Sequence, residues 1–223
     1  MSLILNIDTA TETAQVSFAG DGKLLHSLHN ESQKDHASFL QVAIQQLIRS
    51  AAITLAEVDA IAVTAGPGSY TGLRVGMSSA KGLCYALNKP LITINTLEGL
   101  TVAAIQQSNE PGNVLYCAMI DARRMEVFTA IYSSKMATLF SPCAMILQQD
   151  SFINQLEKDQ IVFFGSGAAK WKVLCNHPNA SFTVASNLPA AMAQLSHTYF
   201  TRNDFADLAY SEPFYLKEFQ DKI

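Results

Sequence analysis

The sequence has few charged residues, few cysteines and no long apolar run, and each of these absences excludes a class of protein. Charged residues make up 15% of the 223 residues and hydrophobic residues 49%, so the chain can bury a sizeable core and is not typical of a disordered protein. A net charge of −4 argues against binding nucleic acid alone through a basic face, but not against a role in a complex whose partner holds the RNA. No apolar run is long enough to span a bilayer.

Metal sites, disulfides and secretion have equally little support. The four cysteines lie far apart without Cys-x-x-Cys spacing, which predicts reduced structural thiols. The five histidines form neither a His-x-x-x-His nor a His-Glu-x-x-His pair, so no metal site is predicted. The N-terminal segment has no basic region and reaches Asp8 too early for a signal peptide. We therefore expect a cytoplasmic protein with no membrane segment.

The most informative stretch joins a short apolar strand, 58–63, to a predicted helix, 71–87, through a loop rich in glycine. Glycine permits a tight turn with positive φ or a close backbone approach, and a serine or threonine can cap the helix. A strand, a glycine loop and a helix N-terminus can together hold an anion on free N–H groups. The loop lacks the lysine of a Walker A motif and the spacing of the dinucleotide fingerprint, so a turn without a ligand is an equal alternative. The candidate anion-binding residues are Asp8, Gly66, Gly68, Ser69, Thr71 and Arg74.

Two predicted helices, 35–52 and 71–87, are apolar over a wider arc than one sheet face requires. Asp35 is the expected N-cap of the first helix. Either each helix lies between its sheet and a neighbour within the chain, or its second face contacts another protein. The candidate contact residues are His36, Phe39, Leu40, Ala43, Ile44, Leu47, Gly72, Gly76, Met77, Ala80, Leu83 and Leu87. On the second interpretation, Ala43→Glu or Ala80→Glu should abolish the contact and leave the chain folded.

One pattern occurs twice along the chain. An apolar strand that ends in Asp8, and another that ends in Asp121, are each followed by a turn and a returning strand. The repeat predicts an α/β fold of two duplicated subdomains with mixed sheets, 1–109 and 110–223. Within the second subdomain, residues 133–142 are predicted to form an irregular hairpin or loop.

The two strand-end aspartates admit two interpretations. Carboxylates that face each other across a cleft could hold a magnesium nucleotide through water. Alternatively, each aspartate could cap its own turn by accepting hydrogen bonds from backbone N–H groups. For Asp121, which is followed by Arg123 and Arg124, the second interpretation is preferred, whereas for Asp8 neither is favoured.

Taken together, these residues resemble the bacterial TsaB (YeaZ) family. The resemblance is carried by residues 4–12, His36 before a long apolar helix, 66–76, 120–127 and 213–217. It implies an actin/Hsp70-like (ASKHA), ribonuclease-H-like fold whose second subdomain is shortened. It also implies a non-catalytic accessory role in making N6-threonylcarbamoyladenosine at position 37 of tRNAs that read ANN codons.

The same resemblance implies a set of partners. The chain would form a heterodimer with TsaD, a paralogue that carries the transferase site, with assistance from the ATPase TsaE. It would form a homodimer when alone and contact tRNA only through the complex. It would have no cofactor of its own, and ATP or ADP would bind only at the complex interface.

Two departures from the nucleotide-binding and metal-binding relatives argue against independent catalysis. The TsaD-type metal motif is His-x-x-x-His, but His36 is followed at the second ligand position by Leu40. The first phosphate turn, residues 8–11, lacks a glycine. The alternative function is a stand-alone ASKHA-fold ATPase or small-molecule kinase, which would place a nucleotide among Asp8, the glycine loop and residues 165–167. A self-associating scaffold without a TsaD partner is the third interpretation.

Overall fold

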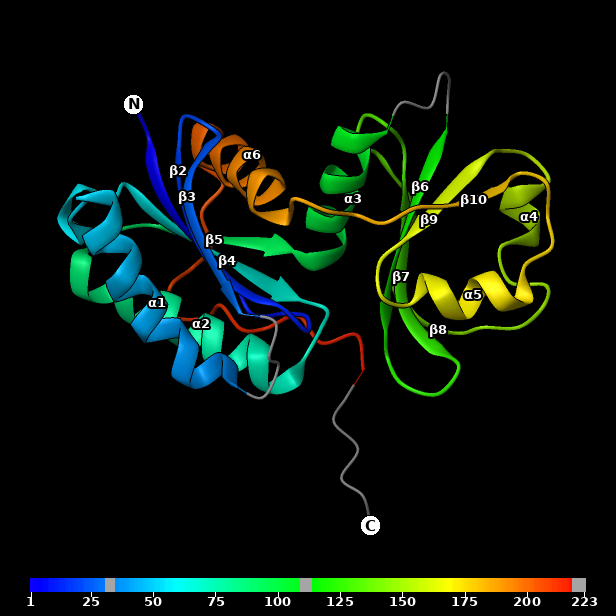
Figure 1. The fold of residues 1–223 in the computed structure, drawn as a ribbon, viewed down its shortest axis with the longest axis horizontal. Helices are drawn as coiled ribbons and strands as arrows, with labels where there is room; N and C mark the ends of the chain where they lie inside the picture. The colour runs from blue at the N-terminus through cyan, green and yellow to red at the C-terminus, as the bar shows by residue number, and fades with distance from the viewer. Residues whose placement is uncertain (31–34, 109–113, 218–223) are drawn as a thin grey trace, which may run out of the picture. The chain divides into compact units, whose positions relative to one another are not determined.

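The computed structural model describes residues 1–30, 35–108 and 114–217, and the chain divides into two compact units (Figure 1). The first unit comprises Met1–Thr96 and Asn187–Phe214, and the second comprises Leu97–Ser186 together with the C-terminal residues from Tyr215. This division differs from the predicted boundary between residues 109 and 110. None of the helices in the described residues is both long and apolar enough to cross a membrane.

The first unit is built on a five-stranded mixed sheet. Its strands are β1 (Leu3–Asp8), β2 (Ala14–Gly20), β3 (Lys23–Asn30), β4 (Ala60–Gly66) and β5 (Leu91–Asn95), in the order β3-β2-β1-β4-β5. β1, β2 and β3 pair antiparallel, whereas β4 pairs parallel with both β1 and β5. The predicted strand that ends in Asp8, followed by a turn and a returning strand, is therefore confirmed.

Helices cover both faces of this sheet. α1 (His36–Ala51) and α2 (Tyr70–Leu87) pack on one face, and α6 (Leu188–Thr201) packs on the other (Figure 1). The Ser69 hydroxyl caps α2 by accepting a hydrogen bond from the Gly72 N–H at 3.3 Å. Asp35 occupies the N-cap position of α1 but makes no side-chain capping bond, contrary to prediction. A short 3-10 turn, η2 (Leu55–Glu57), precedes β4.

The second unit repeats the first sheet with the same strand order. Its strands are β6 (Leu115–Asp121), β7 (Glu126–Tyr132), β8 (Thr138–Ile146), β9 (Ile161–Phe164) and β10 (Ala180–Phe182), in the order β10-β9-β6-β7-β8. α4 (Ile153–Leu156) and α5 (Ala168–Leu174) stand where α1 and α2 stand in the first unit, and both are much shorter. The predicted duplication, with a shortened second half, is thus confirmed, as is the actin/Hsp70-like fold.

The predicted irregular hairpin at 133–142 is confirmed, because its later part belongs to the edge strand β8, which pairs antiparallel with β7 through two register shifts. Pro142 lies where the register between the two strands shifts, a place that tolerates a residue without an N–H. α3 (Thr96–Gln107) packs on the second sheet, whereas α6 packs on the first, and the predicted boundary at 109/110 lies outside the described residues.

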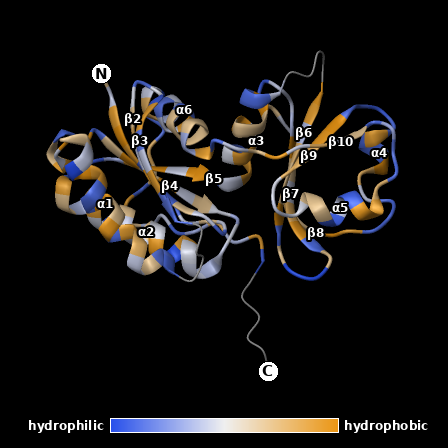
Figure 2. Cartoon of the chain, viewed as in Figure 1, coloured by the Kyte–Doolittle hydropathy of each residue, from blue (hydrophilic) through white to orange (hydrophobic). Residues whose placement is uncertain are grey.

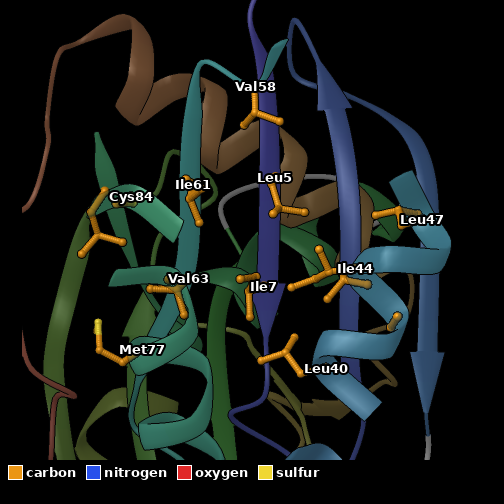
Figure 3. Close-up of a cluster of buried hydrophobic side chains, with 14 of the residues drawn as sticks. Leu5, Ile7, Leu40, Ile44, Leu47, Val58, Ile61, Val63, Met77 and Cys84 are labelled. Atoms are coloured by element: carbon orange, nitrogen blue, oxygen red, sulfur yellow. The ribbon is translucent and has the colours of Figure 1, made fainter. Parts of the chain in front are cut away.

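The apolar core of the first unit lies between the sheet and the helix pair α1 and α2 (Figures 2 and 3). Leu40, Ile44 and Leu47 of α1 point towards the strands, where they meet Leu5 and Ile7 of β1 (Figure 3). Burying each such side chain contributes roughly 1.5–3 kcal/mol relative to leaving it exposed. The inner stripes of both helices are therefore committed to this chain's own core.

Candidate functional site

Asp8 ends β1 and directs its carboxylate back onto its own turn. One oxygen, Oδ1, accepts hydrogen bonds from the Ala10 N–H at 3.0 Å and from the Thr64 hydroxyl at 2.7 Å. Gln15 donates to the other oxygen at 3.4 Å. Burial raises the pKa of Asp8, although these hydrogen bonds oppose that rise. Asp8 therefore caps its own turn, which was one of its two predicted roles.

The glycine loop is pressed against the turn that Asp8 caps. The Ser69 N–H donates to the Ala10 carbonyl at 2.7 Å, and the Thr9 hydroxyl donates to the Gly72 carbonyl at 2.7 Å. A Cβ atom at Gly68 would lie 2.2 Å from the Ala10 carbonyl oxygen, and one at Gly72 would lie 2.0 Å from that of Thr9. Only glycine fits at these two positions, as the predicted close backbone approach requires.

Gly66 meets the other predicted requirement, because its φ is +121°. The C-terminal segment runs past this residue. The Phe214 N–H donates to the Ala65 carbonyl at 2.6 Å, and a Cβ atom at Gly66 would lie 2.4 Å from the Phe214 carbonyl oxygen. The loop is thus packed on both sides by backbone of the same unit.

This packing occupies donors that an anion would need. The N–H groups of Ser69 and Gly72 already donate to the Ala10 carbonyl and the Ser69 hydroxyl. Thr71 and Arg74 are exposed, and the Arg74 guanidinium lies over the ring of Tyr70, 4.1 Å from its centroid. The structure therefore brings Asp8, Gly68 and Ser69 together where α2 meets the turn after β1, whereas Thr71 and Arg74 are exposed.

His36 is the first residue of α1 and is buried. Its Nε2 atom is 3.2 Å from the Glu12 carbonyl oxygen, and its Nδ1 atom has no hydrogen-bond partner among the described residues. A Cβ atom at Gly72 would lie 3.3 Å from that Nδ1 atom. Within residues 1–30, 35–108 and 114–217, no group of three or more His, Cys, Asp or Glu side chains is arranged to hold a metal ion.

Asp121, at the corresponding strand end of the second unit, is half-exposed and paired. Its Oδ1 atom accepts hydrogen bonds from the Arg123 N–H at 2.6 Å and from the Lys170 ammonium at 2.7 Å. Partial desolvation raises its pKa, but the bonds from Lys170 and Arg123 outweigh that effect, so the pKa lies below its usual value. The preferred interpretation, in which Asp121 caps its own turn, is confirmed.

The helix residues predicted to contact a partner are mostly in the wrong place for that role. Nine of the twelve are buried within the chain, namely His36, Leu40, Ala43, Ile44, Leu47, Gly72, Gly76, Met77 and Ala80. Phe39, Leu83 and Leu87 are half-buried. Six of the nine, namely Leu40, Ala43, Ile44, Leu47, Met77 and Ala80, belong to the apolar stripes of the two helices, and a helix turns such a stripe towards its own sheet.

The opposite surface of the same helix pair is open. Val42 of α1 is 64% exposed and Tyr85 of α2 is 83% exposed. A Cβ atom at Gly82 would meet nothing within 4 Å. The two helices are joined by a hydrogen bond of 3.0 Å from Gln41 to Ser79. We call the following exposed residues the outer helix face: Val42, Ser78, Gly82, Tyr85 and Ala86.

The sequence carried a signal for this surface. The residues at 78, 82 and 86 of α2 recur at helical spacing on the side opposite the buried stripe, and all three are small. Small side chains on an exposed helix allow another helix to approach closely. A search for the strongest apolar stripe passes over them, because glycine, serine and alanine add little to it.

Comparison with known proteins places this geometry among tRNA-modification proteins. A family model for TsaD, described as tRNA N6-adenosine threonylcarbamoyltransferase, matches residues 28–214. The tRNA threonylcarbamoyladenosine biosynthesis protein TsaB of Haemophilus influenzae is 27% identical to this chain. The alignment covers 96% of this chain and 93% of the Haemophilus protein. A tRNA N6-adenosine threonylcarbamoyltransferase of Sphingopyxis alaskensis is 36% identical, but over only 44% of the chain and 33% of its own length.

A solved structure shows the same relationship in three dimensions. YeaZ from Pseudomonas aeruginosa superposes with a TM-score of 0.76 at 27% sequence identity. The superposition covers 97% of this chain and 100% of the other. The likeness therefore extends over both units.

Proposed function

The chain belongs to the TsaD family, and we propose that within this family it is a TsaB-type accessory subunit for the threonylcarbamoyladenosine modification of tRNA. The observation that carries the proposal is how much of each related protein aligns with this chain. Nearly the whole chain matches a TsaB protein, whereas the matching transferase is aligned over only a third of its length. The resemblance to the TsaB (YeaZ) family inferred from the residues is confirmed.

The proposed role is non-catalytic and needs no cofactor within this chain. His36 is buried, and Leu40 stands at the position of the second histidine of a TsaD-type motif. The glycine loop is packed against the Asp8 turn, and two of its N–H groups are occupied. These contacts give no support to a stand-alone ATPase or kinase.

We further propose that the outer helix face binds a paralogous TsaD-type transferase. The face combines exposed apolar side chains, Val42 and Tyr85, with an open helix surface at Gly82. Stable interfaces bury about 1,600 Å² in total and have an apolar centre that exposed side chains of this kind supply. Without the transferase, the same face could pair with a second copy through a two-fold axis. In this scheme a TsaE-type ATPase assists, and tRNA is contacted only in the complex.

The sharpest test is Gly82→Arg. Because a side chain at this position enters open space, and because arginine favours a helix interior by roughly 1 kcal/mol over glycine, the variant should fold at least as well as the wild type. It should nevertheless fail to co-elute with the transferase subunit in size-exclusion chromatography. Val173→Arg, at an 86% exposed position of α5, is the matched control and should co-elute normally.

Two results would contradict this proposal. Normal co-elution of Gly82→Arg would exclude the outer helix face as the contact. Titration calorimetry of the isolated chain with ATP and Mg²⁺ separates the accessory role from the enzyme alternative, because micromolar binding with turnover would favour a stand-alone ATPase.

A further inference from the structure

The turn between β6 and β7 carries two adjacent arginines in a backbone conformation that their side chains disfavour. Arg123 has φ +70° and Arg124 has φ +48°, and both are exposed. The turn is well held, because the Glu126 N–H donates to the Arg123 carbonyl at 3.1 Å and the Ala122 N–H donates to the Glu126 carbonyl at 3.1 Å. Glycine or asparagine is the usual residue where φ is positive in a hairpin. A turn that only reverses the chain does not need arginine at these positions, so the two arginine side chains indicate a further role.

These arginines have no counter-charge within the described chain. The carboxylates at the two ends of the turn are already paired, Asp121 with Lys170 at 2.7 Å and Glu126 with Lys217 at 2.8 Å. In the parts of the chain that the structure describes, neither arginine forms an ion pair. The turn therefore keeps two unbalanced positive charges on a chain whose net charge is −4.

We propose that Arg123 and Arg124 contact phosphates of the tRNA backbone in the assembled complex. A guanidinium presents its N–H groups in a fork that matches phosphate oxygens bidentately, and it stays charged at every physiological pH. Two such groups on a firmly held hairpin form a fixed anchor for a polyanion. Phosphate contacts position a nucleic acid without reading its sequence, which suits a subunit that has no catalytic site of its own. This inference rests on the proposed function.

The test removes the charges and relieves the backbone strain in one variant. Arg123→Asn with Arg124→Gly replaces both residues by ones that accept positive φ, so the variant should unfold at the same temperature as the wild type or higher. In complex with the transferase subunit, it should bind an unmodified tRNA transcript that reads an ANN codon more weakly. The slope of log K against log salt concentration should become shallower by about 2. Lys135→Gln with Lys158→Gln removes two charges from other exposed positions of the second unit and is the control, with an unchanged slope.

Arg123→Lys with Arg124→Lys keeps the charge but not the fork, so it should retain most of the salt slope and lose part of the affinity. Equal slopes and affinities for the Asn–Gly variant and the wild type, with normal assembly, would overturn this inference and leave the proposed function intact. Failure of the wild-type chain to assemble with the transferase would instead refute the proposed function. If the Asn–Gly variant loses binding to the ATPase subunit but binds tRNA as the wild type does, the turn contacts an acidic protein surface. If MgATP competes with tRNA for the wild-type complex, the turn binds a nucleotide. Either result would overturn the inference.

Discussion

The Thr9 hydroxyl donates a buried hydrogen bond of 2.7 Å to the Gly72 carbonyl, which fixes the turn after β1 against the first turn of α2. The same approach brings the Thr9 carbonyl oxygen to within 2.0 Å of where a Cβ atom at residue 72 would lie. The glycine-rich loop therefore resembles a phosphate cradle in sequence, but in the structure it serves as a close contact between two backbone segments.

Gly72→Ala should destabilise the first unit, although alanine favours a helix. Overpacking of this kind typically costs about 1–3 kcal/mol, and the clash is with backbone, which cannot move away cheaply. Gly82→Ala lies in the same helix over open space and should stabilise by about 1 kcal/mol. Urea midpoints of the two variants should therefore move in opposite directions, and a higher midpoint for Gly72→Ala would show that the close approach is not real.

Asp8→Asn should change the pH dependence of stability. Because burial raises the pKa of Asp8 in the folded state, the folded chain holds this proton more tightly than the unfolded chain. The wild type therefore loses stability as the pH rises from about 4 through the folded pKa, whereas the asparagine variant does not. The free energy of unfolding of the variant relative to wild type should rise over that range and then level off.

Asp121→Asn is the matched control, because the pKa of Asp121 is lowered instead. Its contribution is present above the unfolded pKa and is lost as the pH falls, so the variant should become relatively less stable as the pH rises. Since Asp121 is half-exposed, the difference should stay below about 1 kcal/mol. Parallel pH profiles for the two variants would contradict the assigned environments.

Ala80→Glu should unfold or strongly destabilise the first unit. Ala80 lies on the buried side of α2 and is 0% exposed, so a carboxylate there would be buried without a partner, at a cost of several kcal/mol. Ala43→Glu should behave in the same way, because Ala43 is only 2% exposed. This expectation differs from the prediction made from the sequence, in which both variants fold and lose only their partner. Circular dichroism of purified variants measures it, and native spectra would reinstate the earlier prediction.

Thiol labelling should divide the four cysteines into two pairs. Burial raises the pKa of Cys84 and of Cys117 to about 12, so neither forms the reactive thiolate near neutral pH. Cys143 and Cys175 are half-buried and should react first with an aromatic disulfide reagent at pH 8. Mass spectrometry of the labelled native chain should find the label at these two positions, and all four should react in denaturant. Early labelling of Cys117 would contradict its burial.

The secondary structure followed closely from local pattern. The helix predicted over 71–87 is found at Tyr70–Leu87, and the strands predicted to end in Asp8 and Asp121 end there in the structure. Turns, caps and apolar periodicity act over a few residues, so they are readable without the fold. The hairpin at 133–142 follows from the pattern, but the continuation of β8 to Ile146 does not, because Pro142 interrupts the alternation. A proline is tolerated there since β8 is an edge strand that pairs along one side only.

The sequence by itself determined that the chain has two duplicated α/β halves, that both aspartates end strands, and that glycine is required where α2 begins. Only the tertiary structure decided which side of each helix is outside. A broad apolar arc shows that a helix has two packing surfaces, but its strongest stripe is taken by the sheet of the same chain, since that contact buries the most area. The less apolar surface, which includes Val42, Gly82 and Tyr85, remains available to a partner. Its exposure depends on how the helices pack and does not follow from residue spacing alone.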